Sequence, residues 1–309
     1  MGMKAHGVLF IAILPIYLGC QEEADCQVTE LLQRSLEVET PHLRRLKASP
    51  MFWLHIPKCG TSFYNTVTHL PGMCPDLPVN LSMGDESVWG KCFETHFRAL
   101  CPTLCDQKLL HCDWPPTATH QFLVDSKYEE YKGHFVGLFR QPEQRLLSAY
   151  HDDKDLFRSD PFIPACSNET MTKELSMEEF IQRYASFETG QLVGTLINLT
   201  LADVPKAIER LEQGFAFVGL QEEWELSICL FHAKFGGPCL SVDFEDTRPS
   251  HGGKASLYDT SILNGWVDEL DRPVYAKAKE IFERDLQKFG ISHETCKSCY
   301  DEAGLVWQD

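Results

Sequence analysis

Positive charge is scarce in this chain. Only 28 of the 309 residues are Lys or Arg, against 45 Asp and Glu, which gives a formal net charge of −17 at pH 7. A balance this acidic disfavours nucleic acid and anionic membrane surfaces as partners, and it argues against a densely sulfated polyanion as the bound molecule. A binding site for phosphate must therefore concentrate its positive charge locally, and Lys58, Arg140 and Arg145 are the candidates to supply it.

A long hydrophobic run is also missing. The apolar segment 8–18 is interrupted by Pro15, preceded by Lys4 and followed by the acidic sequence QEEAD. It is shorter than the roughly 20 residues that a membrane-spanning helix needs, so residues 1–20 are predicted to be a signal peptide in preference to a short membrane anchor. The charged residues 21–49 are predicted to form a stem.

The chain has no internal repeats, and its most informative stretch lacks the order of a Walker A loop. Residues 51–64, MFWLHIPKCGTSFY, are typical of a buried parallel strand over 51–56 and a turn into a helix that opens near Ser62. A Walker A loop has Lys and Ser/Thr after its glycines, as GxxxxGK(S/T), whereas Lys58 precedes Gly60. The stretch is therefore not an ATPase loop.

The turn is nevertheless suited to bind an anion. The backbone N–H groups of Gly60, Thr61 and Ser62 can converge on a phosphate at the positive end of the helix dipole. Gly60 lets the backbone approach the ligand closely, and Lys58 supplies a mobile cation. Cys59 lies inside the loop, where a disulfide would distort the site, so it is predicted to be a free thiol.

A second strand-to-helix junction has similar chemistry. The apolar run HFVGLFR, residues 134–140, ends at Arg140 and is followed by Pro142 and a helical stretch that carries Arg145 and Ser148. An Arg at the carboxyl end of a strand can donate two parallel hydrogen bonds from its guanidinium to a phosphate. Ser148 lies about two helical turns farther along and can add a hydroxyl donor.

Both segments resemble the phosphate-binding segments of sulfotransferases that use 3′-phosphoadenosine 5′-phosphosulfate (PAPS), in the carbohydrate branch of the heparan sulfate 2-O- and 6-O-sulfotransferases. The first is similar to the 5′-phosphosulfate loop, and the pattern Arg-x-Pro-x-x-Arg-x-x-Ser-x-Tyr is similar to the 3′-phosphate segment. Weaker similarity at 215–230 and 271–286 extends the resemblance over roughly residues 51–290.

The resemblance implies a role for each matched residue. Lys58 would contact the bridging oxygen of PAPS as charge develops on the leaving group. The cofactor-binding set would be Lys58, Cys59, Gly60, Thr61 and Ser62 at the 5′-phosphate, Arg140 and Ser148 at the 3′-phosphate, and Lys254 in a loop that closes over the nucleotide. Many relatives have Thr or another small residue where this chain has Cys59. PAPS is the only co-substrate implied, and no metal is.

The catalytic base has several candidates. His55 stands in the sequence HIPK, which resembles that of the 6-O-sulfotransferases, whose equivalent His is the proposed base. His111 opens HCDW, another similar stretch, and His134 precedes the second strand. An unperturbed imidazole pKa of about 6.5 suits a base near neutral pH. Carboxylates at Glu222 and Glu223 are the alternatives.

Thirteen cysteines indicate an oxidising compartment. The CxxC at Cys296 and Cys299 has no clear second pair for zinc, so structural disulfides are expected there and at Cys229 and Cys239, with connectivity left open. Residues 71–119 are expected to be a disulfide-rich insertion beside the site. Acceptor sequons for N-glycosylation stand at Asn80, Asn168 and Asn198.

These patterns predict an α/β fold, with a P-loop-like parallel sheet flanked by helices and a disulfide-rich insertion. A sulfotransferase domain is expected over 50–295, followed by a C-terminal tail, 296–309. Further strands are expected at 121–124, Phe215–Leu220 and 240–244, and helices at Met177–Tyr184 and 204–212.

The predicted function is PAPS-dependent O-sulfation of a carbohydrate hydroxyl in the secretory pathway, in the Golgi lumen or after secretion. Many relatives have a longer Golgi anchor, from which this chain departs, so membrane contact is expected only through a short N-terminal anchor. A protein-tyrosine sulfotransferase is the rival enzyme, although its loop normally contains Arg-Ser-Gly. A catalytically inactive, secreted nucleotide- or glycan-binding protein is the alternative outside enzymes.

Overall fold

The computed structural model describes residues 51–74, 77–82, 120–151, 175–247 and 257–307, all within the unit that spans residues 45–309. The predicted signal peptide and stem, most of the insertion at 71–119 and the loop at 248–254 lie outside the described residues. So do His111, Lys254 and Asn168.

Three parallel strands form the described sheet, in the order β1 (Phe52–Trp53), β2 (Phe135–Phe139) and β3 (Phe215–Leu220). Phe52 pairs with Phe135, and Phe135 with Phe215, so aromatic rings line up where the strands begin. All five residues of β2 are buried, as expected for a central parallel strand. The predicted α/β fold with a parallel sheet flanked by helices is confirmed, although β1 is shorter than the predicted strand 51–56.

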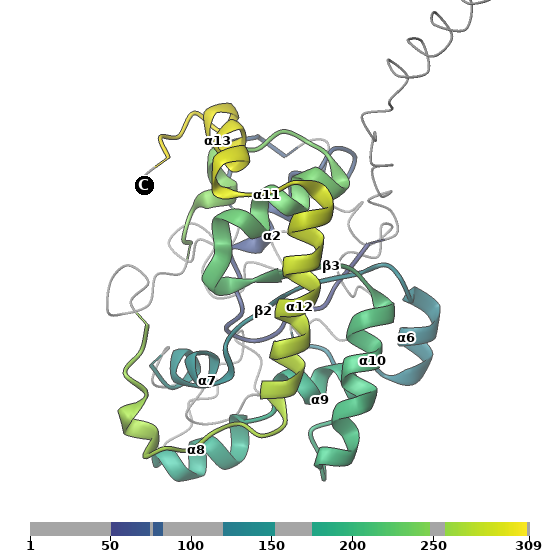
Figure 1. Ribbon diagram of the computed structural model, residues 1–309, viewed down its shortest axis with the longest axis vertical. Coiled ribbons are helices and arrows are strands. Elements are labelled where there is room, and N and C mark those ends of the chain that lie inside the picture. Colours follow the sequence, from purple (N-terminus) through teal and green to yellow (C-terminus); the bar gives the residue numbers. More distant parts are fainter. Residues whose placement is uncertain (1–50, 75–76, 83–119, 152–174, 248–256, 308–309) are drawn as a thin grey trace, which may run out of the picture. The chain divides into compact units, whose positions relative to one another are not determined.

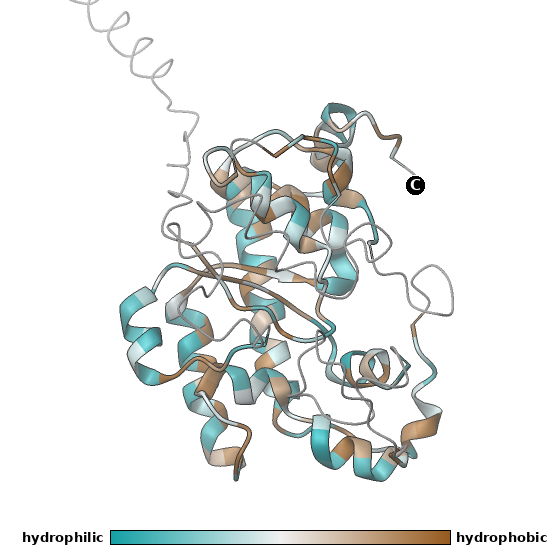
Figure 2. Ribbon diagram, turned by 180° about the vertical axis from the view of Figure 1, so that it is seen from behind, coloured by the Kyte–Doolittle hydropathy of each residue, from teal (hydrophilic) through white to brown (hydrophobic). Residues whose placement is uncertain are grey.

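Helices pack around this sheet (Figure 1). Their bounds are α2 Phe63–Thr68, α6 Asp125–Tyr131, α7 Pro142–His151, α8 Met177–Tyr184, α9 Phe187–Val193, α10 Val204–Gly214, α11 Trp224–Phe235, α12 Asp271–Phe289 and α13 His293–Glu302, with short 3₁₀ turns η1 Leu201–Asp203, η2 Gln221–Glu223, η3 Ser241–Phe244 and η4 Thr260–Leu263. The long helix α12 packs against β3, α10 and α11. In Figure 2 the strands are largely brown, whereas the helices also carry teal, hydrophilic residues.

The apolar periodicity predicted for α12 is confirmed. Val274, Ala278, Ile281 and Phe282 are buried, and Leu286 is half-buried at the margin of the same core. The predicted helix at Met177–Tyr184 is also confirmed; it begins with a capping box formed by Ser176 and Glu179.

The predicted strand at 121–124 is wrong. Leu123 donates its N–H to the carbonyl of Gln191 in α9, 2.7 Å away, and the Leu123 carbonyl accepts from the Arg210 guanidinium. Val124 is then the N-cap residue of α6. The backbone groups of this segment are satisfied by a helix and a side chain, so they do not join the sheet.

The predicted strand at 240–244 is wrong as well, because this segment forms the 3₁₀ turn η3. The Asp243 carboxylate accepts from the Leu240 N–H at 2.8 Å, and the Asp243 N–H donates to the Leu240 carbonyl at 3.0 Å. The same carboxylate pairs with the buried His232 ring of α11 at 3.0 Å. These local bonds close the turn in place of sheet pairing.

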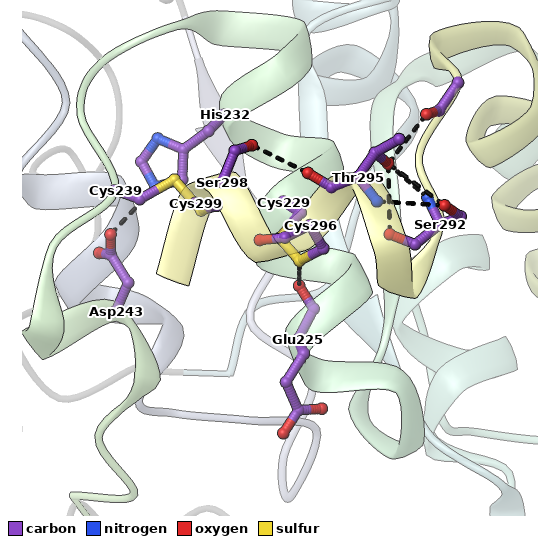
Figure 3. Close-up of a disulfide and its surroundings, with 11 residues drawn as sticks. Glu225, Cys229, His232, Cys239, Asp243, Ser292, Thr295, Cys296, Ser298 and Cys299 are labelled. Atoms are coloured by element: carbon purple, nitrogen blue, oxygen red, sulfur yellow. Dashed lines mark hydrogen bonds and ion pairs between the residues drawn. A yellow bond between two sulfur atoms is a disulfide. The ribbon is translucent and has the colours of Figure 1, made fainter. Parts of the chain in front are cut away.

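Two disulfides fasten α13 to the middle of α11 and to the segment that follows α11 (Figure 3). Cys229 pairs with Cys296 and Cys239 pairs with Cys299, with Cα atoms 5.8 and 5.3 Å apart. The prediction of structural disulfides at these four cysteines is confirmed, and the two CxxC residues are joined to different partners. Helix α13 spans the boundary predicted at residue 295, and both of its cysteines are buried.

Candidate functional site

The carboxyl ends of the three strands bring polar residues to one edge of the sheet. The loop 57–62 follows β1, Arg140 follows β2 and Gln221 follows β3. Since all three strands are parallel, these segments emerge on the same side, where open α/β sheets commonly bind ligands.

The loop after β1 has an unusual backbone. Lys58 and Gly60 both adopt left-handed conformations, with φ of 65° and 84°, and the Phe63 N–H bonds to the Gly60 carbonyl at 3.1 Å as α2 begins. Within the described part of the chain, the amides of Gly60, Thr61 and Ser62 donate no hydrogen bonds. No described acceptor would therefore compete with an anion for these three amides.

Only glycine fits at position 60. A Cβ atom there would lie 2.6 Å from Gln221 Oε1, 2.7 Å from Trp224 Cζ3 and 2.8 Å from Leu138 Cδ1. The loop is therefore pressed against the ends of β2 and β3. The sequence interpretation did not single out Gln221. Its Oε1 is buried without a hydrogen bond to any described residue.

Arg140 joins the two predicted phosphate segments. Its Nη1 donates to the Lys58 carbonyl at 3.1 Å, across a separation of 82 residues. Its guanidinium lies 5.7 Å from the centre of the Tyr258 ring, and its buried Nε donates to none of the described residues. The structure thus brings the basic residue after β2 against the loop after β1.

The hydroxyl residues of the loop have partners of their own. Thr61 Oγ1 lies 3.2 Å from Nε2 of His55. Ser62 Oγ lies 3.0 Å from Thr247 Oγ1 and accepts the Thr247 N–H at 3.1 Å. A hydroxyl that accepts the Thr247 N–H still has its proton to donate, either to Thr247 Oγ1 or to a phosphate oxygen.

His55 is held beside this loop by aromatic contacts. Its ring stacks on Trp53 at 4.5 Å between centroids and lies 4.9 Å from the ring of His120. The sequence interpretation missed His120, which has no motif around it. His55 is thus close to Thr61, on the side of the sheet where the phosphate segments meet.

The other candidate bases are placed differently. His134 precedes β2, whose far end carries Arg140, so the two are separated by the strand's length of about 20 Å. Glu222 and Glu223 are both exposed, and Glu222 accepts the Gln141 N–H at 2.8 Å and the Tyr275 hydroxyl at 3.2 Å. Glu222 therefore has a structural task at the start of α7.

Arg145 does not join the phosphate segments. It is buried, donates to the Tyr184 carbonyl at 2.9 Å and pairs with Asp271 at 3.5 Å. The sequence suggested that Arg145 adds local positive charge, but this ion pair offsets it. Ser148, one helical turn farther, is buried on α7, and its side chain makes no hydrogen bond to a described residue.

A buried carboxyl group lies beneath the loop. Glu188 of α9 is fully buried, and its Oε1 accepts the Arg140 N–H at 3.1 Å and faces the Cys59 thiol at 3.6 Å. Burial, followed by the charge of Asp271, raises the pKa of Glu188 well above its usual value. The sequence interpretation did not single out Glu188, because no motif marks it.

The prediction that Cys59 is a free thiol is confirmed. Burial and the neighbouring Glu188 raise the pKa of this thiol well above its ordinary value. A buried, protonated thiol is a poor nucleophile, so Cys59 is expected to pack and donate a hydrogen bond without reacting.

No family model matches the chain, and neither a curated protein nor a solved structure does. Across the described ranges, no His, Cys, Asp and Glu side chains gather in groups of three or more that could hold a metal ion. The helices of those ranges include none that is long and apolar enough to cross a membrane.

Proposed function

We propose that the chain is a PAPS-dependent O-sulfotransferase that modifies a carbohydrate hydroxyl, with a P-loop-like anion site at the sheet edge. The observation that carries the proposal is the 3.1 Å hydrogen bond from Arg140 to the Lys58 carbonyl. This contact puts a guanidinium beside a loop that has three available amides and a lysine. Two separate groups of anion donors at one edge suit a nucleotide with two phosphate positions.

In this proposal the two segments divide the nucleotide between them. The amides of Gly60, Thr61 and Ser62 and the loop hydroxyls bind the 5′-phosphosulfate. Arg140 and Ser148 bind the 3′-phosphate and so select PAPS over nucleotides that lack it. Cys59 packs beneath the loop, and Lys254, outside the described residues, is retained as a further contact to the nucleotide.

The reaction needs no covalent enzyme intermediate. The acceptor oxygen attacks sulfur, a new O–S bond forms, and the bond from sulfur to the bridging phosphate oxygen breaks with release of 3′,5′-ADP. Lys58 stabilises the negative charge on that oxygen, and His55 takes the acceptor's proton. His111, also outside the described residues, would orient the acceptor.

A carbohydrate acceptor within the secretory pathway agrees with several features of the chain. The acceptor residues Asn80 and Asn198 are exposed, as glycosylation requires, and the α13 disulfides suit an oxidising compartment. Cys74 is also disulfide-bonded, in line with a stapled insertion that shapes the acceptor cleft. The net charge of −17 favours an acceptor that is not densely sulfated.

Calorimetric titration with 3′,5′-ADP and 5′-AMP tests the nucleotide site. The wild type should bind 3′,5′-ADP far more tightly, and Arg140→Ala should lose about 10- to 100-fold for 3′,5′-ADP while changing little for 5′-AMP, since a hydrogen bond to a charged group contributes about 1.5–3 kcal/mol. Arg284→Ala is the matched control, because Arg284 pairs with Glu212 just before β3 begins, at the opposite edge. Equal affinity of the wild type for both nucleotides contradicts the assignment of Arg140 and Ser148.

A further inference from the structure

The loop after β1 and the end of β2, which carry the proposed phosphate-binding residues, contact the same buried side chain. We propose that Glu188 is a positioning residue that holds the loop after β1 and the end of β2 in register for nucleotide binding. This inference rests on the proposed function for its ligand, but the contacts on which it depends belong to the structure alone.

A single carboxyl oxygen of Glu188 contacts hydrogen-bond donors from both segments. Glu188 Oε1 accepts the backbone N–H of Arg140 at 3.1 Å and faces the Cys59 sulfur at 3.6 Å. Cys59 is one residue before Gly60, and the Arg140 N–H belongs to the residue whose guanidinium reaches the Lys58 carbonyl. Glu188 therefore fixes the backbone from which each anion-binding group projects.

The position of Glu188 is itself constrained by α12. The Glu188 N–H donates to Asp271 Oδ2 at 3.1 Å, and the Thr189 N–H donates to Asp271 Oδ1 at 2.8 Å. Thr189 Oγ1 also donates to the carbonyl of Leu270 at 2.9 Å. The start of α9 is thus attached to the start of the 19-residue helix α12, so a site held by Glu188 rests on a rigid element.

The neutral carboxyl suits this task. Five titratable or charged groups interact with Glu188: Asp271 and Tyr275 from α12, Arg145 from α7, Glu222 from η2 and Cys59 from the loop. Burial and the charge of Asp271 raise the pKa of Glu188 well above its usual value, which favours the neutral form, and in that form Oε1 accepts both donors without a buried charge. Deprotonation would place a negative charge beneath a site for anions, so nucleotide affinity should fall as pH rises.

Glutamine provides the conservative replacement, because it keeps an acceptor oxygen in the same place and cannot ionise. Leucine has similar volume without the acceptor. Calorimetry with 3′,5′-ADP should show Glu188→Gln within about 3-fold of the wild type, and Glu188→Leu weaker by about 10- to 100-fold. Asp285→Asn is the control, because it disturbs the buried Lys234–Asp285 pair of α11 and α12 and should keep wild-type affinity at lower thermal stability.

The pH dependence separates positioning from general packing. As pH rises above neutral, the affinity of the wild type for 3′,5′-ADP should fall more steeply than that of Glu188→Gln. Parallel pH profiles of the wild type and Glu188→Gln would overturn the proposal. So would a Glu188→Leu variant that binds 3′,5′-ADP like the wild type, or a Glu188→Gln variant that binds it as weakly as Glu188→Leu. The comparison of wild type with Glu188→Gln decides the matter even where Glu188→Leu does not fold.

Labelling of the Cys59 thiol tests the same contact without a nucleotide. The rate at which a thiol reagent modifies Cys59 is obtained by subtracting the labelling of Cys59→Ala. This rate should rise in Glu188→Leu and stay at the wild-type value in Glu188→Gln. A wild type that binds no 3′,5′-ADP contradicts the proposed function, whereas unchanged Cys59 labelling in Glu188→Leu contradicts the positioning role.

Discussion

Gly60→Ala tests whether the loop is pressed against the ends of β2 and β3. The substitution adds one methyl group at a residue with φ of 84°. The new Cβ atom would meet Gln221 Oε1 at 2.6 Å, Trp224 Cζ3 at 2.7 Å and Leu138 Cδ1 at 2.8 Å. All three distances are shorter than van der Waals contact, so either the loop or its neighbours must move.

The cost has two parts. A left-handed conformation costs a residue with a Cβ about 1–2 kcal/mol, and overpacking a filled site costs about 1–3 kcal/mol. Gly60→Ala should therefore lower the free energy of unfolding by about 2–5 kcal/mol. The displaced loop should also weaken binding of 3′,5′-ADP.

Gly72→Ala is a matched control for the backbone part. Gly72 has φ of 86°, close to that of Gly60, but a Cβ there would meet nothing within 4 Å. Urea unfolding of both variants should show Gly60→Ala less stable than Gly72→Ala by about 1–3 kcal/mol. Equal losses in the two variants would refute the tight packing of the loop.

Four further results are expected. Lys58→Ala should lose about 10²- to 10³-fold in turnover while it still binds nucleotide, because the lysine charge matters most as the leaving group forms; wild-type turnover would exclude it from the mechanism. His55→Ala should keep its affinity for 3′,5′-ADP and lose about 10²- to 10⁴-fold in single-turnover rate; a rate near that of the wild type would show that another group is the base. Cys239→Ala/Cys299→Ala should lower the free energy of unfolding by about 2–4 kcal/mol in urea under non-reducing conditions, and no change would mean that this disulfide does not constrain the unfolded chain. Burial and a neighbouring acidic charge raise the pKa of Asp271 to about 6 from 3.8, so its proton stabilises the fold below about pH 4 and this contribution is lost as pH rises through 6. Relative to Asp271→Asn, the free energy of unfolding of the wild type should therefore fall by on the order of 3 kcal/mol between about pH 4 and pH 7. A difference between the two proteins that does not change with pH would contradict the raised pKa.

Features that depend on local sequence were predicted well. An uninterrupted apolar run marks β2 and β3, and helical spacing marks α12, because these elements bury faces that the pattern shows directly. The junctions after β1 and β2 could be recognised for the same reason, since a basic residue and a turn follow each apolar run.

Features that depend on distant partners could not be predicted. The segment 121–124 is strand-like in composition, yet the Arg210 guanidinium, 87 residues away in the sequence, donates a hydrogen bond to the Leu123 carbonyl. Burial of Arg145 depends on Asp271, and the role of Glu188 depends on two segments that only the fold brings together. The disulfide connectivity likewise required the packing of α13 on α11.

Transfer of radiolabelled sulfate from PAPS tests the proposed activity most directly. The purified protein is incubated with PAPS, a panel of glycans of low sulfation and a tyrosine-containing peptide, with Lys58→Ala as the inactive control. We expect label on at least one glycan, none on the peptide, and a loss of about 10²-fold or more in the control. Label on the peptide alone would indicate a protein-tyrosine sulfotransferase, and a wild type that binds 3′,5′-ADP but labels neither acceptor would contradict catalysis and indicate a nucleotide-binding protein.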